Sequence, residues 1–220
     1  MYSAALDTTP GMAGFALMNG EKLVLNVNFP VKGRDASKLS SLIIDELKKC
    51  SVSLEDISFW SVGSGPGSFT ALRQAAALVS GWCFGRNSVK TRCIPGAAAL
   101  AAEASPADGE EVCCIYDGRN KEILYYNILF KDGDYHDTGK SGVLNQAQAS
   151  VFFDGYTAKT VCFVGEYEAV SKIIPENINV VQAEKSDASV LCRIKTVPFD
   201  NDLTRLVYIR PAVYITENRD

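Results

Sequence analysis

Residues 63 to 73 read Gly63-Ser64-Gly65-Pro66-Gly67-Ser68-Phe69-Thr70-Ala71-Leu72-Arg73, the densest cluster of glycine and proline in the chain. The residues before it, 57–62, are mostly aromatic or β-branched, which predicts a buried strand. The residues after it, 71–84, are rich in alanine and leucine and contain no proline, which predicts a helix. The stretch therefore predicts a strand, a glycine loop and a helix in direct succession.

The loop itself allows two interpretations. Its glycines permit a positive φ or a close approach of another group, and Pro66 restricts the backbone. Ser68 or Thr70 is a candidate N-cap, and the start of the helix could receive an anion. The alternative is a rigid corner that aims the helix. Neither the Walker lysine nor the strict dinucleotide spacing is present. The motif residues of this loop are Gly65, Pro66, Gly67, Ser68, Phe69, Thr70 and Arg73.

Composition narrows the class of protein. With 220 residues, 47% of them hydrophobic, the chain can build one or two globular domains. A net charge of −4 without a run of Lys and Arg argues against a free-standing nucleic-acid binder. We therefore expect contact with a nucleic acid only indirectly, through a partner. Seven cysteines without metal spacing are typical of reduced thiols. No signal peptide or bilayer-spanning run is evident, so we expect a cytoplasmic protein without membrane contact.

The order of predicted elements occurs twice. The first half has strands at 2–6, 14–18 and 22–29, a helix at 36–50, a strand at 57–62, a helix at 71–84, a strand at 90–94 and a helix at 95–104. After a linker at 105–109, the second half has strands at 112–116, 123–130 and, weakly, 135–138, a helix from 146 to 153, a strand at 160–165, a helix at 166–174, a strand at 178–183 and a helix at 187–195. Two tandem β-β-β-α-β-α-β-α subdomains, 1–104 and 105–220, predict an α/β chain of the actin-like ATPase or ribonuclease H-like fold.

Local signals support several boundaries. Asn19-Gly20 predicts a type I′ hairpin turn, because both residues tolerate positive φ. Asp35 is a candidate N-cap for the first helix. The sequences of residues 53–56 and 145–148 are typical of capping boxes or N-caps.

Both first strands end in an aspartate, Asp7 and Asp117. In the actin-like architecture the hairpins after these strands hold nucleotide phosphates, and carboxylates suit magnesium. The first loop lacks a glycine-rich run, whereas the second carries Arg119 and Lys121. We favour the interpretation that these are turn residues, so no cofactor is required, although weak binding of ATP or ADP with magnesium stays open. The candidate cofactor-binding residues are Asp7, Thr8, Thr9 and Asp117.

Catalytic chemistry finds little support. The single histidine, His136, cannot supply the histidine pair of a metal site, so we expect no metal ligands. No Cys-His or Ser-His pairing is suggested, which disfavours a peptidase. We therefore assign no catalytic residue.

The helix after the glycine loop has an unusually wide apolar arc. Leu72, Ala76 and Val79 lie along one face, and Ala75 and Leu78 lie along a neighbouring one. Either the 36–50 helix alone covers this arc or a second chain does. The candidate partner-binding residues are Leu39, Leu42, Ile43, Ala71, Leu72, Ala75, Ala76 and Val79. Ala76→Arg or Val79→Arg is predicted to leave the fold intact and to prevent pairing.

Three motifs carry a resemblance to a known family. They are Ala5-Leu6-Asp7-Thr8-Thr9, the run from Gly65 to Arg73, and Asp117-Gly118-Arg119-Asn120-Lys121-Glu122-Ile123-Leu124-Tyr125. Together they resemble the TsaB family of bacterial threonylcarbamoyladenosine biosynthesis proteins, which belongs to the glycoprotease-like group. The resemblance is strong over residues 1–130 and weaker beyond, where Tyr208-Ile209-Arg210 is similar to the family's closing motif.

The resemblance implies a non-catalytic paralogue of TsaD, the enzyme that places threonylcarbamoyl on a tRNA adenosine. It also implies binding to TsaD through helices of the N-terminal half, a complex that includes the ATPase TsaE, and homodimers through the same surface. Three departures bear on that interface: Asp35-Ala36 replaces the family's His-Ser pair, and Ala71 and Ala75 replace glycines. The alternative function is a small ATP-binding phosphotransferase or ATPase of the same architecture.

Overall fold

The computed structural model describes residues 1–8, 12–30, 37–118, 122–156, 160–164, 174–176 and 178–209. The first half contains β1 (Tyr2–Asp7), β2 (Met12–Asn19), β3 (Lys22–Pro30), α1 (Leu39–Lys49), the 3-10 helix η2 (Leu54–Asp56), β4 (Ile57–Gly63), α2 (Phe69–Cys83), β5 (Lys90–Ile94), α3 (Ala97–Ala101) and the 3-10 helix η3 (Ala102–Ala104). The second half contains β6 (Glu110–Asp117), β7 (Glu122–Lys131), β8 (Asp134–Asn145), α4 (Gln146–Asp154), β9 (Thr160–Val164), β10 (Asn179–Ala183) and α6 (Ser189–Arg193).

The strands form two five-stranded sheets with one topology. The first sheet has the order β3-β2-β1-β4-β5, and the second, read in the matching direction, has the order β8-β7-β6-β9-β10, so each strand takes the place of its counterpart. In both sheets the first three strands of the half pair antiparallel and the last two join in parallel. The predicted repetition is confirmed for the strands. The predicted helix at 166–174 lies almost wholly outside the described residues.

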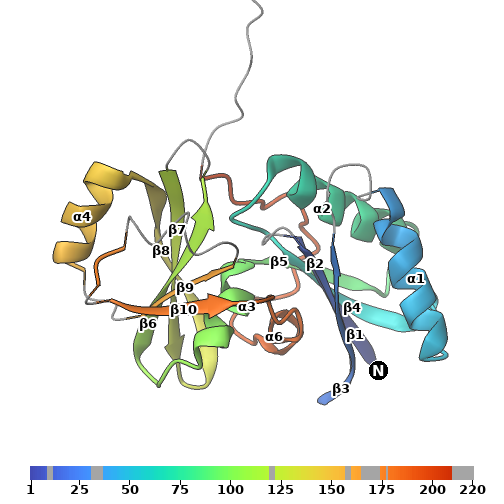
Figure 1. Cartoon of the computed structure of the whole chain (residues 1–220). Helices are drawn as coiled ribbons and strands as arrows, with labels where there is room; N and C mark the ends of the chain where they lie inside the picture. Colours follow the sequence, from blue (N-terminus) through green and yellow to red (C-terminus); the bar gives the residue numbers. More distant parts are fainter. Residues whose placement is uncertain are drawn as a thin grey trace, which may run out of the picture.

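Helices and sheets stack in layers (Figure 1). Helices α1 and α2 cover the outer face of the first sheet, α3 and α6 lie between the two sheets, and α4 covers the outer face of the second. Strand β1 separates two of the cores, because successive side chains of a strand point to opposite faces. Ala4 and Leu6 face α1 and α2, whereas Ala5 faces the layer between the sheets. The end of β1 is therefore aimed at the junction of the two halves.

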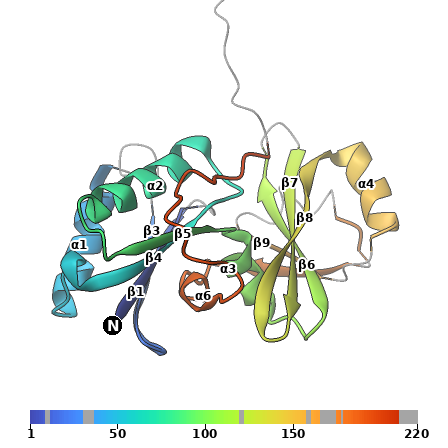
Figure 2. The same cartoon turned by 180° about the vertical axis from the view of Figure 1, so that it is seen from behind.

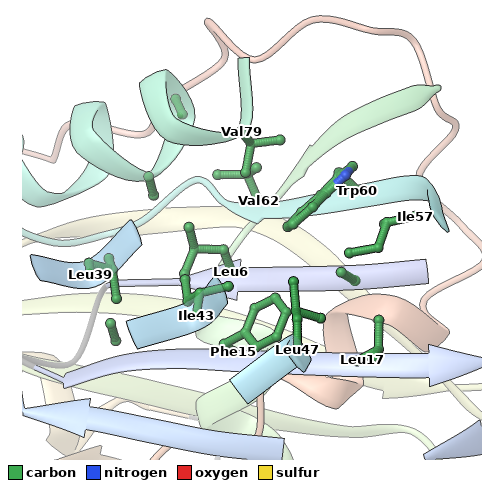
Figure 3. Close-up of a cluster of buried hydrophobic side chains, with 14 of the residues drawn as sticks. Leu6, Phe15, Leu17, Leu39, Ile43, Leu47, Ile57, Trp60, Val62 and Val79 are labelled. Carbon is green, nitrogen blue, oxygen red and sulfur yellow. The ribbon is translucent and has the colours of Figure 1, made fainter. Parts of the chain in front are cut away.

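The outer core of the first sheet is continuous across α1, α2 and the strands (Figure 3). Leu39 and Ile43 of α1 and Val79 of α2 point toward Phe15 and Trp60 of the sheet, and all five side chains are buried. The ring centroids of Phe15 and Trp60 lie 6.3 Å apart. Burying side chains of this size contributes roughly 1.5–3 kcal/mol each, which makes this layer a main source of stability.

The C-terminal elements return to the first half. Helix α6 contacts β1, β2 and β4 of the first sheet, while α3 contacts β6, β7 and β9 of the second. Figure 2 shows the segment that follows α6 passing β5 and rising beside α2. Each half therefore contributes a helix that packs on the other half's sheet. The division into 1–104 and 105–220 stays a prediction.

A buried arginine holds the C-terminal elements against the first sheet. Arg92 of β5 is 2% exposed, and its guanidinium donates to the hydroxyl of Ser61 and to the carbonyls of Leu191 and Val197 at 2.9, 2.9 and 2.7 Å. Its charge also lies 4.1 Å from the ring centroid of Phe199. Burial lowers the pKa of Arg92. The side chain thus joins the first sheet to the carboxyl end of α6 and to the segment that follows.

Local predictions had mixed outcomes. Asn145 caps α4 in a capping box with Gln148, as predicted, and Asp56 accepts from the Ser53 amide at 2.8 Å. The hairpin turn is centred on Gly20 and Glu21, with a positive φ on Gly20 alone, so the type I′ prediction is wrong. The weak strand predicted at 135–138 is the 12-residue β8, and Asp35 lies outside the described residues.

Candidate functional site

The carboxyl ends of β1 and β6, whose aspartates the sequence leaves open as weak nucleotide contacts, meet the layer between the sheets. Asp7 is fully buried, accepts a hydrogen bond from Ser186 Oγ at 3.4 Å, and packs directly over Gly63. A methyl group at Gly63 would overlap the Asp7 carboxylate. The absence of a side chain at Gly63 therefore leaves the space that the Asp7 carboxylate occupies. In this conformation Asp7 has no surface that a ligand could reach.

The other candidate cofactor residues lie in different environments. Thr8 is 7% exposed, and its hydroxyl donates to the Ala71 carbonyl of α2 at 3.0 Å. Asp117 ends β6 on an exposed position, and Thr9 lies outside the described residues. Magnesium-bound phosphate needs carboxylate oxygens that it can reach. Asp7 and Thr8 do not fit that requirement as placed, and both act as contacts within the chain.

Tyr116 is a member of this junction that the sequence did not predict. It is 7% exposed, and its hydroxyl has no hydrogen-bond partner within the described residues. Burial raises the pKa of Tyr116, and the nearby Cys114 thiol and Asp7 carboxylate raise that pKa further. A bulky neutral phenol thus lies near Asp7. Its position in β6, immediately before Asp117, was the available signal, because alternation turns it toward the first half.

The glycine loop joins three separate parts of the chain. The Ser64 amide donates to Ile94 at the end of β5, and the Ser64 carbonyl accepts from Val207, both at 2.7 Å. Gly65 has φ +114, and a Cβ there would lie 2.8 Å from the Val207 carbonyl oxygen. Only glycine meets both conditions comfortably. The described loop residues therefore receive the C-terminal segment, as the rigid-corner interpretation requires.

The first turn of α2 carries an aromatic and basic cluster. Ser68 occupies the N-cap position, but its side chain makes no capping hydrogen bond. The Arg73 guanidinium lies 3.7 Å from the ring centroid of Phe69 and donates through Nε to the Tyr208 hydroxyl at 3.2 Å. The rings of Phe69 and Tyr208 are 4.7 Å apart. Two motifs separated by more than a hundred residues therefore form one contact.

Six of the eight predicted partner-binding side chains lie in the chain's own core, so they need correction as contact residues. They are Leu39, Ile43, Leu72, Ala75, Ala76 and Val79, all at most 8% exposed. The wide apolar arc is covered from within by α1 and by Leu203 and Leu206 of the C-terminal segment. An arginine at Val79 would therefore place a charge in the core and disrupt the fold. Of the eight, Leu42 is 38% exposed and Ala71 is half-buried.

The exposed face of α2 consists of different residues. Arg73, Ala77, Ser80 and Phe84 follow one another at helical spacing, and all are exposed, Phe84 to 88%. Small side chains at the middle of this face permit close approach of another helix. This face, with Leu42 of α1, is the surface that a partner could reach.

A groove runs between α2 and the C-terminal segment. Its volume is about 800 Å³, and its walls include Ala77, Ser80 and Cys83 on one side and Asn201 and Thr204 on the other. Pockets of this size hold small molecules or side chains of a partner. The exposed face of α2 and the groove adjoin each other along Ala77 and Ser80.

The described ranges contain no group of three or more His, Cys, Asp or Glu that could bind a metal ion. His136 lies in β8, where its Nε2 is 3.1 Å from the Lys131 carbonyl oxygen. In the described part of the chain, no helix is long and apolar enough to cross a bilayer.

The family model of TsaD, described as tRNA N6-adenosine threonylcarbamoyltransferase, matches residues 34–184, which is more than half of the chain. The chain belongs to the TsaD family. This match includes α1, the glycine loop and α2, which form the candidate interface. No curated protein matches the sequence.

Solved structures agree with this membership. A protein described as similar to the peptidase YeaZ from Pseudomonas aeruginosa has 22% identity and a TM-score of 0.74, with 95% of this chain and 99% of that chain covered. YeaZ from Pseudomonas aeruginosa has 22% identity and a TM-score of 0.71, with 87% and 88% covered. The resemblance predicted from the motifs is therefore confirmed at the level of the TsaD family, and the fold of the chain is similar to that of YeaZ over most of its length.

A more distant structure supports the fold class. The activator of 2-hydroxyisocaproyl-CoA dehydratase from Clostridium difficile, solved with bound ADPNP, has a TM-score of 0.50 at 9% identity, with 88% of this chain and 95% of that chain covered. The predicted α/β, actin-like ATPase fold is confirmed.

Proposed function

We propose that this member of the TsaD family is a non-catalytic adaptor subunit of the machinery that forms threonylcarbamoyladenosine in tRNA. It binds a TsaD-type catalytic subunit through the exposed face of α2 and Leu42, and it meets a TsaE-type ATPase and tRNA only through that complex. The same face pairs two copies of the chain when the catalytic subunit is absent. The protein works in the cytoplasm.

The observation that carries the proposal is the burial of Asp7. Asp7 ends β1, where the actin-like architecture places a phosphate contact, yet its carboxylate is enclosed by Gly63 and Ser186. Thr8 meanwhile donates to α2. The residues after β1 therefore support the α2 helix. The α2 face itself combines small side chains with an exposed aromatic side chain, and aromatic residues are enriched in interfaces.

Co-purification with the TsaD-type subunit of the same genome tests the adaptor function. Ala77→Arg adds a long charged side chain to the middle of the α2 face without entering the core, and arginine is a good helix former. We expect wild type to co-elute with the catalytic subunit and Ala77→Arg to elute alone with an unchanged circular dichroism spectrum. Val151→Arg is the matched control, because Val151 is 75% exposed on α4, at the opposite end of the molecule.

Failure of wild type to co-elute would reject the adaptor function. Co-elution of Ala77→Arg would reject the α2 face as the interface. A strain that lacks the endogenous adaptor links the contact to the pathway. In that strain, wild type and Val151→Arg should restore the tRNA modification, and Ala77→Arg should not.

The second candidate function is a small ATP-binding phosphotransferase or ATPase. What favours it is the fold, which the ADPNP-bound activator shares at low identity. Calorimetric titration of the isolated chain with magnesium-ATP distinguishes the two functions. Micromolar binding with turnover would support the phosphotransferase, whereas heats at the level of dilution would support the adaptor.

A further inference from the structure

The segment 200–208 is attached to the edge of the first sheet by its own small turn. Asn201 and Thr91 of β5 exchange hydrogen bonds: the Asn201 amide donates to the Thr91 carbonyl, and the Thr91 amide donates to Asn201 Oδ1, both at 2.9 Å. Asn201 has φ +62, which asparagine tolerates. Since β5 is the edge strand of the sheet, this exchange satisfies a part of its free edge.

The same segment has internal structure. Asp202 accepts from the Thr204 amide at 2.9 Å, from the Thr204 hydroxyl at 2.6 Å and from Arg205 Nε at 3.0 Å. Arg205 also pairs with Asp200 at 2.8 Å. Contacts that close within six residues persist when the segment leaves the sheet. The turn can therefore move as one body.

Its far end rests on the glycine loop and α2. The Val207 amide donates to the Ser64 carbonyl, and the Tyr208 hydroxyl accepts from Arg73. Its apolar packing is limited to three side chains: Leu203, 9% exposed, belongs to the core under α1 and α2, and Leu206 and Val207 are partly buried against the first core and the core between the sheets. Most of the other side chains of 200–208 are exposed. Few apolar contacts and exposed backbone hydrogen bonds mark the regions of a protein that open at low free energy.

Cys93 of β5 lies under this segment. Burial, helped by the nearby Asp202 and Asp200 carboxylates, raises the pKa of the Cys93 thiol to about 11. The thiol is thus kept protonated and shielded by the same residues that form the turn. Its reactivity reports whether the segment is in place.

We propose that residues 200–208 form a strap that opens and recloses over β5 and the glycine loop while both sheets stay folded. The strap forms one wall of the groove beside α2, so opening removes that wall and changes the surface at Ala77 and Ser80. The strap is therefore a conformational device that sets the state of the α2 surface. This inference does not depend on the adaptor function, because the isolated chain is sufficient to measure it.

Peptide-resolved alkylation of the full chain with iodoacetamide tests the strap. Asn201→Gly keeps the backbone conformation accessible and deletes the side-chain acceptor for Thr91, so the labelling rate of Cys93 is expected to rise about fivefold, the effect of one typical hydrogen bond. Cys114 and Cys162 of the second sheet are fully buried, and their thiols donate to the carbonyls of Ala97 and Leu100, so they are expected to keep their rates. Asn87→Ala, on the opposite wall of the groove, is the matched control and leaves Cys93 unchanged.

Urea dependence separates local from global opening. In wild type, Cys93 labelling is expected to vary little at low urea, whereas Cys162 labelling rises steeply, because only global unfolding exposes large surface. Tyr208→Phe, which deletes the acceptor for Arg73 and keeps the ring, gives a smaller rise at Cys93. An unchanged Cys93 rate in Asn201→Gly, or rates of Cys93 and Cys162 that rise in parallel, would overturn the proposal.

Discussion

Gly65→Ala tests the central geometric claim, that the glycine loop is shaped to receive the C-terminal segment. At φ +114 an alanine costs about 1–3 kcal/mol of backbone strain. Its Cβ would also lie 2.8 Å from the Val207 carbonyl oxygen and 3.1 Å from Leu72 Cδ1. Moving Val207 away breaks its hydrogen bond to Ser64, worth about 1 kcal/mol. We expect the free energy of unfolding to fall by about 2–4 kcal/mol.

Urea and thermal denaturation measure this loss. For a chain of this length, 1 kcal/mol corresponds to about 2–4 °C, so the Tm should fall by about 4–16 °C. Gly81→Ala is the matched control: Gly81 lies in α2 with open space around its Cβ position, and alanine there should stabilise by about 0.5–1 kcal/mol. A Gly65→Ala variant within 0.5 kcal/mol of wild type would refute the argument that Val207 and the backbone require glycine.

Three further predictions follow from buried polar groups. Arg92→Met should lower the free energy of unfolding by about 3–5 kcal/mol, because the carbonyls of Leu191 and Val197 lose their hydrogen-bond donor. The urea midpoint of Arg92→Lys should lie between those of Arg92→Met and wild type, and equal midpoints for all three proteins would contradict this prediction. Asp7→Ala should lower the free energy of unfolding by about 1–3 kcal/mol, because the buried Ser186 hydroxyl loses its acceptor. An unchanged urea midpoint would show that the Asp7 carboxylate does not stabilise the fold. Burial raises the pKa of the Cys113 thiol to about 12 from its ordinary 9.0, so the unfolded chain loses its proton first and stability should fall as pH rises from about 9 towards 12. The difference in urea midpoint between wild type and Cys113→Ala should therefore shrink from pH 8 through pH 9.5 to pH 11. A difference that stays constant over these pH values would exclude the Cys113 thiol as the cause of the loss of stability.

The sequence predicted the fold because its signals were local and occurred twice. The turn at Gly20, the cap at Asn145 and the strand, loop and helix around Gly65 each act within a few residues. The repeated order of elements then predicted two subdomains of one architecture, and the structure shows two sheets with one strand order. The length of β8 was missed because its residues are polar and exposed along much of the strand, which weakens the alternation that marks a strand.

The candidate surface was harder to predict, because an apolar arc does not say what covers it. Ala76 and Val79 belong to the arc that the sequence identified, but α1 and Leu203 cover it from within the same chain. Leu203 is remote in sequence, and its approach depends on Arg92 and Asn201, whose partners no local pattern specifies. The face left exposed, with Ala77 and Ser80, has no strong hydrophobic signal.

The same return of the chain encloses the end of β1, where the actin-like architecture places a phosphate contact. Helix α6 and Ser186 close the junction over Asp7, while Tyr116 fills space on the other side with a neutral side chain. The Asp7 carboxylate occupies the space that a side chain at position 63 would fill, so it fixes the packing of β1 against β4. Thr8, adjacent to Asp7, donates a hydrogen bond to the Ala71 carbonyl and so links the end of β1 to α2. In this structure the end of β1 therefore supports one helix, α2, and the proposed strap contacts the same helix through Tyr208 and Arg73.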